Sequence, residues 1–202
     1  ARALSAVPPY YYSYRNDSVL EYLREVASST SLPFLYYHIP ERTGVEIDER
    51  FVEKLISLPN VAGMKYSHTD LAFQERVQSL AGPRFRIFCG TDEILLPSLV
   101  TGAAGAIGST YNFLAPLFLP LWNAFHDGRL ADARALQRRA NRVITVLSRY
   151  PGIAASKEAL RILGLDLGEP RAPQSRLDHG ELAALARDIV AAGLRDLDGS
   201  QV

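Results

Sequence analysis

The sequence contains one cysteine, one methionine and one tryptophan in 202 residues. A single cysteine, Cys89, excludes an internal disulfide framework and favours a reducing compartment. No apolar run approaches the roughly 18 residues that a membrane-spanning helix needs, and no stretch has the pattern of a signal peptide. We therefore expect a cytoplasmic protein.

An excess of charge of either sign is also missing, because 22 Lys and Arg residues balance 22 Asp and Glu residues. No overall field therefore draws the protein to nucleic acid or to an anionic membrane. The four histidines do not have metal-ligand spacing and Cys89 has no partner, so no metal site is predicted. What remains is an ordinary globular composition, 48% hydrophobic, at a length that suits one domain with a substantial core.

Short apolar runs alternate with amphipathic stretches over residues 1–128. The apolar runs predict strands at 3–7, 33–37, 61–65, 85–89 and 104–107. The amphipathic stretches predict helices at 18–29, 48–57, 70–81, 92–101 and 116–127. Because the strands are continuous apolar runs rather than alternating ones, they indicate a parallel sheet covered by helices. The predicted fold class is α/β, with five strand–helix units.

The pattern changes after Gly128 to helices alone. Apolar residues at helical spacing predict a helix over 130–149, and two more are expected near 155–163 and 179–192. The arginines of the first helix fit a solvated face better than a nucleic-acid site, because the total charge is balanced. We expect residues 129–202 to form a helical extension of the same domain as residues 1–128.

Polar and ionisable side chains gather where the predicted strands end. In parallel α/β folds, ligands bind at the C-terminal ends of the strands. The segments at or after the five strand ends are PPYYY (8–12), YYHIP (36–40), KYS (65–67), CGTDE (89–93) and GSTYN (108–112). This crowding favours an enzyme over a purely structural protein.

Lys65 is the one lysine of three that stands at a predicted strand end, directly after the apolar run VAGM. A lysine at such a place usually marks the point where the chain meets water. If it is partly desolvated, its neutral amine can instead attack a keto group and form an iminium that accepts electrons. Tyr37, at the end of the preceding strand, is the candidate proton carrier. The alternative for Tyr37 is a core tyrosine with a satisfied hydroxyl.

Two further motifs carry weaker signals. The glycines of GAAGAIG (102–108) do not have the spacing of a nucleotide-binding loop, and they predict close backbone approach beside a ligand. Asp92 and Glu93 stand at the start of a predicted helix, where acidic residues complement the helix dipole. They could equally bind substrate hydroxyl groups, and both roles can hold together.

Four motifs together resemble one family: YYHIPERTGV (36–45), VAGMKYSHTDL (61–71), GTDEILLPSLVTGAAGAIGSTYN (90–112) and ALRILGLDLGEPRAP (159–173). They resemble the N-acetylneuraminate lyase and dihydrodipicolinate synthase superfamily of class I, Schiff-base aldolases. The resemblance implies a (β/α)8 barrel with a C-terminal helical extension, usually tetrameric, that needs no metal or organic cofactor. It implies that Lys65 forms the Schiff base, that Tyr37 shuttles protons and that Tyr11 relays protons across a subunit contact.

The resemblance points to two kinds of family member. The acidic pair and IGSTYN (107–112) resemble the N-acetylneuraminate lyases, which implies that the substrate is bound by Ser67, Gly90, Asp92, Glu93, Gly108 and Ser109. Arg42 in PERTG resembles the synthases, whose arginine meets a substrate carboxylate. We give the acidic pair and STYN more weight and expect a lyase that cleaves a 2-keto-3-deoxy sugar acid, such as N-acetylneuraminate, to pyruvate and an aldehyde. The alternative is a synthase-like condensation of pyruvate with an aldehyde.

One part of the family pattern has no counterpart in the sequence. Family chains begin with three further strand–helix units, and a Gly-Ser/Thr-Thr-Gly-Glu motif there binds the pyruvyl carboxylate. Five units cannot close an eight-stranded barrel. We therefore expect either a fragment that lacks the first units or a truncated relative. A truncated relative that binds ligands or assembles without catalysis is the second hypothesis.

Overall fold

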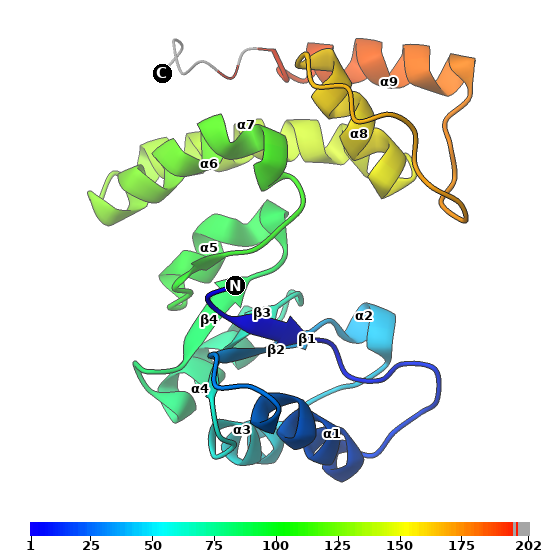
Figure 1. Ribbon diagram of the computed structural model, residues 1–202. Coiled ribbons are helices and arrows are strands. Elements are labelled where there is room, and N and C mark those ends of the chain that lie inside the picture. Colours follow the sequence, from blue (N-terminus) through cyan, green and yellow to red (C-terminus); the bar gives the residue numbers. More distant parts are fainter. Residues whose placement is uncertain (196, 198–202) are drawn as a thin grey trace. The chain divides into compact units, whose positions relative to one another are not determined.

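The structure is a computed structural model that describes residues 1–195 and 197 (Figure 1). The chain divides into two compact units, Ala1–Gly108 and Ser109–Val202. The first unit is α/β and the second is helical. The division after Gly108 comes earlier than the change in sequence pattern after Gly128. As a result, α6 (Tyr111–His126) belongs to the second unit, although we expected this helix to complete the fifth strand–helix unit. The expectation that 1–128 and 129–202 are parts of one domain stays a prediction.

The first unit is built on a parallel sheet whose strand order follows the sequence (Figure 1). Within the described residues it has five strands: β1 (Leu4–Ala6), β2 (Phe34–His38), β3 (Val61–Tyr66), β4 (Arg86–Cys89) and β5 (Gly105–Ala106). All four neighbouring pairs are parallel, so the carboxyl ends of the strands lie at one edge. The α/β class is confirmed, with five parallel strands among the described residues, where a closed (β/α)8 barrel has eight.

Helices follow each of the first four strands, and their starts obey local rules. They are α1 (Asn16–Ser28), α2 (Pro40–Thr43), α3 (Glu49–Ile56), α4 (Leu71–Ala81), the 3-10 turn η1 (Asp92–Ile94) and α5 (Leu95–Val100). The Asp48 carboxylate accepts a hydrogen bond from the Phe51 N–H, and the Asp70 carboxylate accepts one from the Phe73 N–H, as helix N-caps do. The sequence did not predict α2, because a four-residue helix is too short to show apolar periodicity.

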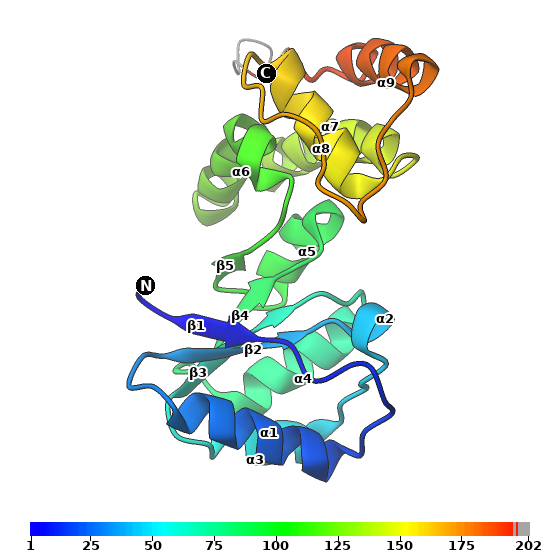
Figure 2. The same ribbon diagram turned by 45° about the vertical axis from the view of Figure 1, so that its right-hand side comes forward.

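The two faces of the sheet have different surroundings. Along β2, Phe34, Tyr36 and His38 are buried, whereas Leu35 and Tyr37 are only half-buried. The same alternation continues in β3, where Met64 and Tyr66 are buried on either side of Lys65. Figure 2 shows α1, α3 and α4 together on one side of the sheet. The core of this unit therefore lies between that face and these helices, and Tyr37 and Lys65 point to the opposite face.

The second unit contains α6, α7 (Leu130–Leu147), α8 (Gly152–Ile162) and α9 (His179–Ala191) within the residues that are described. The helix expected at 116–127 begins five residues earlier, at Tyr111, so Pro116 lies inside the helix rather than at its first position. The apolar stripe predicted for 130–149 is buried along α7 from Ala133 onward, whereas Leu130 is exposed. In the described part of the chain, no helix is long and apolar enough to cross a membrane.

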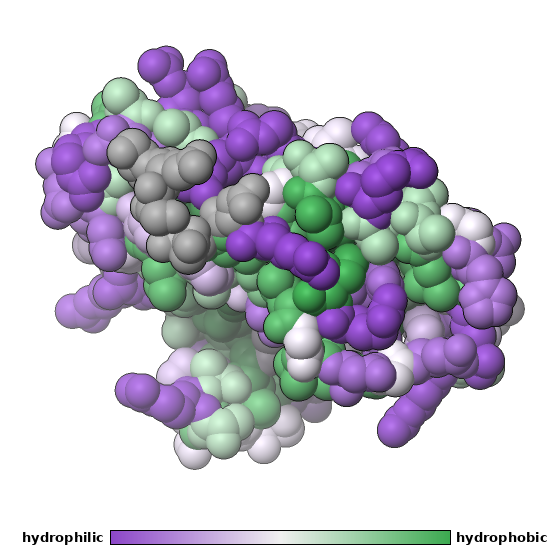
Figure 3. Space-filling model, turned by 90° about the horizontal axis from the view of Figure 1, so that it is seen from above, coloured by the Kyte–Doolittle hydropathy of each residue, from purple (hydrophilic) through white to green (hydrophobic). Residues whose placement is uncertain are grey.

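Charged and apolar side chains are interspersed on the outer surface of the helical unit, which Figure 3 views from above. The exposed arginines of α7 include Arg134, Arg138 and Arg142, one turn apart on a single face of the helix. That placement agrees with a solvated face of an amphipathic helix. The loop after α8 exposes Leu163, Leu165 and Leu167 by 40 to 53%.

Candidate active site

Lys65 and Tyr37 lie side by side on neighbouring strands. They are register partners in the parallel pairing of β2 with β3. The Lys65 Nζ lies 4.1 Å from the centroid of the Tyr37 ring, over its face. The electron-rich face of a phenol ring attracts an ammonium group. Both side chains are half-buried, so the pair is partly shielded from water and still open to a ligand.

The amine of Lys65 differs from those of the other two lysines. Lys54 forms an ion pair with Asp17, with Nζ 2.7 Å from the carboxylate oxygen. Lys157 donates to the backbone carbonyls of residues 167–169. Within the described part of the chain, Lys65 forms neither a hydrogen bond nor an ion pair, and the Tyr37 hydroxyl forms no hydrogen bond. These are the groups that a substrate could engage without first breaking a hydrogen bond or an ion pair.

The absence of a side chain at Gly90 leaves space for the side chain of Lys65. The Ser67 hydroxyl donates a hydrogen bond to the Gly90 carbonyl, with the two oxygens 3.2 Å apart. A Cβ on Gly90 would overlap the Ser67 Oγ and would lie 2.9 Å from the Lys65 Cε. Ser67 and Gly90 therefore stand beside the candidate nucleophile, at the carboxyl ends of β3 and β4, where the sequence placed them.

Asp92 and Glu93 differ in their exposure to solvent. Asp92 is buried, only 6% exposed, whereas Glu93 is exposed. A Cβ on Gly108 would overlap the Asp92 carboxylate, so the close approach expected for the GAAGAIG motif occurs here against a protein side chain. The inward carboxylate is the member of the acidic pair that the fold keeps at the strand ends. Ser109 opens the second unit, and its role stays a prediction.

Arg42 and Tyr11 lie on segments that leave the strand ends. Arg42 is exposed in the last turn of α2, the short helix that follows β2. Tyr11 is 83% exposed between β1 and α1, where its ring meets the Tyr12 ring edge-on at a centroid distance of 4.8 Å. Of the predicted site residues in the first unit, Lys65 thus contacts Tyr37 and Ser67 contacts Gly90. Gly90 has no room for a Cβ beside Lys65, and Gly108 has none beside Asp92.

A buried polar cluster behind the sheet was missed by the sequence analysis. His38 and Tyr66, 2% and 1% exposed, are register partners whose rings stack with centroids 5.3 Å apart. Burial lowers the pKa of His38 to about 4, with a smaller contribution from His68. Burial also raises the pKa of Tyr36 and of Tyr66 above the ordinary range. Successive side chains of a strand point to opposite faces of the sheet. This rule could have placed His38 and Tyr66 on the face opposite to Tyr37 and Lys65.

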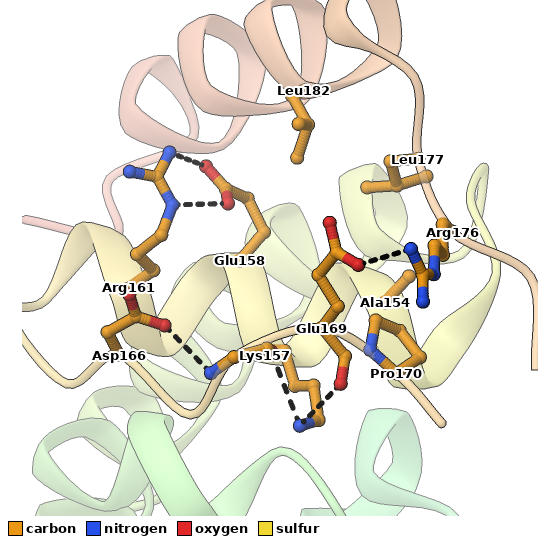
Figure 4. A pocket seen from close by; sticks show the side chains of 11 residues that line it. Ala154, Lys157, Glu158, Arg161, Asp166, Glu169, Pro170, Arg176, Leu177 and Leu182 are labelled. Carbon is orange, nitrogen blue, oxygen red and sulfur yellow. Dashed lines mark hydrogen bonds and ion pairs between the residues drawn. The ribbon is translucent and has the colours of Figure 1, made fainter. Parts of the chain in front are cut away.

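A pocket in the helical unit has a structural explanation. It has a volume of about 250 Å³ between α8, the segment 165–178 and α9. Figure 4 shows the charged groups around it paired with one another: Arg161 with Glu158, and Arg176 with Glu169. Lys157 binds backbone carbonyls of the 165–178 segment. The Lys157 bonds attach the segment to α8, and the two ion pairs lie within α8 and within the segment.

Comparisons with known proteins agree on one family. The model of the Dihydrodipicolinate synthetase family matches residues 1–192. The N-acetylneuraminate lyase of Rhizobium meliloti is 40% identical over 190 residues, which cover 94% of this chain and 62% of that protein. The N-acetylneuraminate lyase structure from Proteus mirabilis has a TM-score of 0.85 at 34% identity, covering 94% of this chain and 65% of that one.

A solved structure of dihydrodipicolinate synthase DapA-2 from Bacillus anthracis is also similar, with a TM-score of 0.89 at 26% identity and coverage of 94% and 65%. The chain thus spans less than two thirds of the length of these relatives. The similarity extends over almost the whole of this chain, so it includes both the sheet unit and most of the helical unit.

Proposed function

The chain belongs to the Dihydrodipicolinate synthetase family, and from this membership we propose that it is a class I lyase of 2-keto-3-deoxy sugar acids. The substrate is an acid such as N-acetylneuraminate, which is cleaved to pyruvate and an aldehyde through a Schiff base on Lys65. The family resemblance of the four sequence motifs is confirmed. The 40% identity with an N-acetylneuraminate lyase supports the choice of substrate class.

The single observation that carries the proposal is the contact between Lys65 and Tyr37. A half-buried amine that has neither a hydrogen bond nor an ion pair among the described residues is suited to attack a carbonyl, because a ligand can reach it without displacing such a partner. A phenol on the adjacent strand is within reach of a substrate that is bound to that amine. Neither group has the other as a hydrogen-bond partner, so each is available to the substrate.

The reaction follows from these two side chains. The neutral Lys65 amine adds to the C2 carbonyl, and loss of water gives a protonated imine. The Tyr37 hydroxyl takes the proton of the C4 hydroxyl and passes its own proton to the substrate carboxylate, so the phenol ends this step as it began. The C3–C4 bond breaks as the aldehyde forms, and its electron pair moves into the imine to give an enamine. Protonation at C3 and hydrolysis release pyruvate and restore the amine.

Substrate hydroxyl groups are the proposed ligands of the neighbouring strand ends. Ser67, Gly90, Asp92, Glu93, Gly108 and Ser109 are the residues that the family resemblance assigns to this role. The inward carboxylate of Asp92 and the hydroxyl of Ser67 beside Lys65 support it, because hydroxyl groups pair well with a buried carboxylate.

Borohydride trapping tests the proposal. Incubation with pyruvate and borohydride should add a stable mass to the peptide that holds Lys65, because hydride reduces the imine to a secondary amine. Lys65→Ala should abolish the labelling, whereas Lys54→Ala, which removes an exposed surface lysine, should leave it intact. A protein that stays unlabelled at Lys65 in the presence of pyruvate contradicts the proposed function.

A synthase-like condensation of pyruvate with an aldehyde is the second candidate. Arg42 favours it, since the helix α2 carries this arginine directly after the strand of Tyr37. The likeness to a dihydrodipicolinate synthase structure supports it as well. The two candidates share the trapped adduct and differ in the second step. Release of pyruvate from N-acetylneuraminate identifies the lyase, and consumption of pyruvate with an added aldehyde identifies the synthase.

The proposal includes a cytoplasmic location and assembly into a tetramer. The single cysteine supports a reducing compartment. The exposure of Tyr11 and its neighbours Tyr10 and Tyr12 supports a contact with a second copy, where Tyr11 would relay protons. Sedimentation of the protein at micromolar concentration tests the assembly, and a monomer would remove the proposed role of Tyr11.

A further inference from the structure

Two successive register pairs connect the strand that carries Tyr37 to the strand that carries Lys65. The pair Tyr37 and Lys65 faces the open side of the sheet, and the next pair, His38 and Tyr66, faces the helices. Adjacent residues of a strand share a peptide plane and point to opposite faces. The orientation of the rear pair therefore determines the orientation of the front pair.

The rear pair is held by aromatic packing. The His38 and Tyr66 rings stack with an interplanar angle of 23°. Tyr66 also meets Phe73 of α4 at a centroid distance of 6.4 Å, and Tyr36 meets Phe51 of α3 at 5.6 Å. The buried rings thus join the ends of β2 and β3 to each other and to two helices.

Hydrogen bonds attach the segment after Lys65 to the same pair. The Tyr66 hydroxyl donates to the Asp70 carbonyl at 2.9 Å, and the Asp70 N–H donates to the His68 Nδ1 at 3.2 Å. The Ser67 N–H donates to the His38 carbonyl at 2.9 Å, which extends the ladder one residue beyond Tyr66. The backbone on both sides of the rear pair is therefore held in place.

We propose that the stacked His38 and Tyr66 are positioning residues that hold Tyr37 and Lys65 in reactive alignment from the opposite face of the sheet. The inference rests on the proposed function of Tyr37 and Lys65. Neither His38 nor Tyr66 touches the substrate, and their effect passes through the two strand backbones. Alignment matters because a displacement of about 1 Å in a reacting group can reduce a rate by about a hundredfold.

Replacement of the imidazole tests the inference. His38→Leu replaces the stacked imidazole ring by an apolar side chain of similar size. We expect kcat for pyruvate release to fall about tenfold with KM within about twofold, since alignment rather than binding is lost. His38→Phe restores a ring against Tyr66 and should recover kcat to within about twofold of the wild type.

The matched control is Phe34→Leu, which removes a fully buried ring from the same face of the same strand at its far end. It should lower thermal stability as much as His38→Leu does and leave kcat within about twofold of the wild type. If Phe34→Leu reduces kcat as much as His38→Leu, the effect belongs to stability and the inference is wrong. If His38→Leu keeps the wild-type kcat, the inference is also wrong.

A second readout does not depend on enzymatic activity. Formaldehyde and cyanoborohydride methylate lysine amines, and mass spectrometry compares Lys65 with the exposed Lys54 of the same molecule. Loss of alignment should release Lys65 from the Tyr37 ring and raise its methylation relative to Lys54 at least about threefold in His38→Leu. The ratio should stay unchanged in Phe34→Leu.

The two failures are thus distinguishable. A wild-type protein that pyruvate and borohydride do not label at Lys65 disproves the proposed function. An unchanged methylation ratio in His38→Leu disproves the positioning role, whether or not pyruvate is bound.

Discussion

The Lys65 amine lies over the face of the Tyr37 ring, 4.1 Å from its centroid, because parallel pairing puts these two residues in register. Separate strands supply the two groups, and each stands between buried neighbours that face the helices. The chemistry of the site therefore depends on a relationship between two backbones rather than on a local motif.

Tyr37→Phe should separate imine formation from cleavage. The variant keeps the ring beneath Lys65 and loses the proton carrier, so pyruvate and borohydride should still label Lys65. Pyruvate release from N-acetylneuraminate should fall by about 10²- to 10⁴-fold. Tyr22→Phe, on the outer surface of α1, is the control and should retain the wild-type rate. A wild-type cleavage rate in Tyr37→Phe would show that another group carries the proton.

Gly90→Ala should displace the Lys65 side chain. The added Cβ would overlap the Ser67 hydroxyl and crowd the Lys65 Cε, and overpacking of this kind costs about 1–3 kcal/mol. The rate of borohydride trapping should fall about tenfold or more, since the amine moves away from Tyr37. Gly152→Ala, where a Cβ meets open space, should change neither stability nor trapping. Trapping at the wild-type rate in Gly90→Ala would show that the space beside Gly90 is not needed.

His38 should make the protein less stable in acid. Its pKa is lowered from 6.5 to about 4 in the folded state. Between pH 4 and 6.5, the imidazole is therefore protonated in the unfolded chain and neutral in the folded chain. The contribution of His38 is therefore complete above pH 6.5 and is lost as the pH falls toward 4, by about 3 kcal/mol in all. The titratable and charged groups around it are Tyr36, Tyr66, His68, Glu46, Asp48, Glu49, Asp70 and Arg76.

Urea denaturation at a series of pH values measures this contribution. The difference in unfolding free energy between the wild type and His38→Phe should change with pH between 6.5 and 4 and stay constant from pH 7 to 8, because other acid-sensitive groups cancel in the difference. A difference that does not vary with pH over the lower interval would mean that His38 is not buried in its neutral form.

Lys157→Met should loosen the segment 165–178 of the helical unit. The ammonium group donates to the carbonyls of Leu167, Gly168 and Glu169. Cleavage by a protease within the segment should become about tenfold faster, because local opening becomes easier. Lys54→Met removes an exposed ion pair, which contributes little, and should leave the cleavage rate unchanged. Equal cleavage in the two variants would assign the attachment to other contacts.

Local pattern was sufficient for most of the first unit. The apolar runs located β2, β3 and β4 to within one or two residues, because strands buried in a parallel sheet have few polar positions. Two helices were placed less well. The expected helix 92–101 is split into η1 and α5, and α6 begins at Tyr111 rather than at 116. Pro97 and Pro116 both lack a backbone N–H, so they disturb the local signals that mark a helix start.

The candidate site was located less completely. Lys65 and Tyr37 were identified because strand ends can be recognised in the sequence, and the structure brings them together. His38 and Tyr66 stand one residue further along the same strands and were not assigned a role. Their importance depends on ring stacking and burial, neither of which a residue-by-residue pattern contains.

The amino-acid sequence by itself determined the α/β class, the order of the strands and helices and the presence of a lysine at a strand end. These properties arise from interactions between near neighbours in the chain, namely apolar runs, helix caps and turns. Tertiary structure alone decided which face of the sheet each strand-end side chain occupies and which ring Lys65 meets. Strand register and helix packing join residues that are distant in the chain, and they are set by the whole core rather than by any one segment.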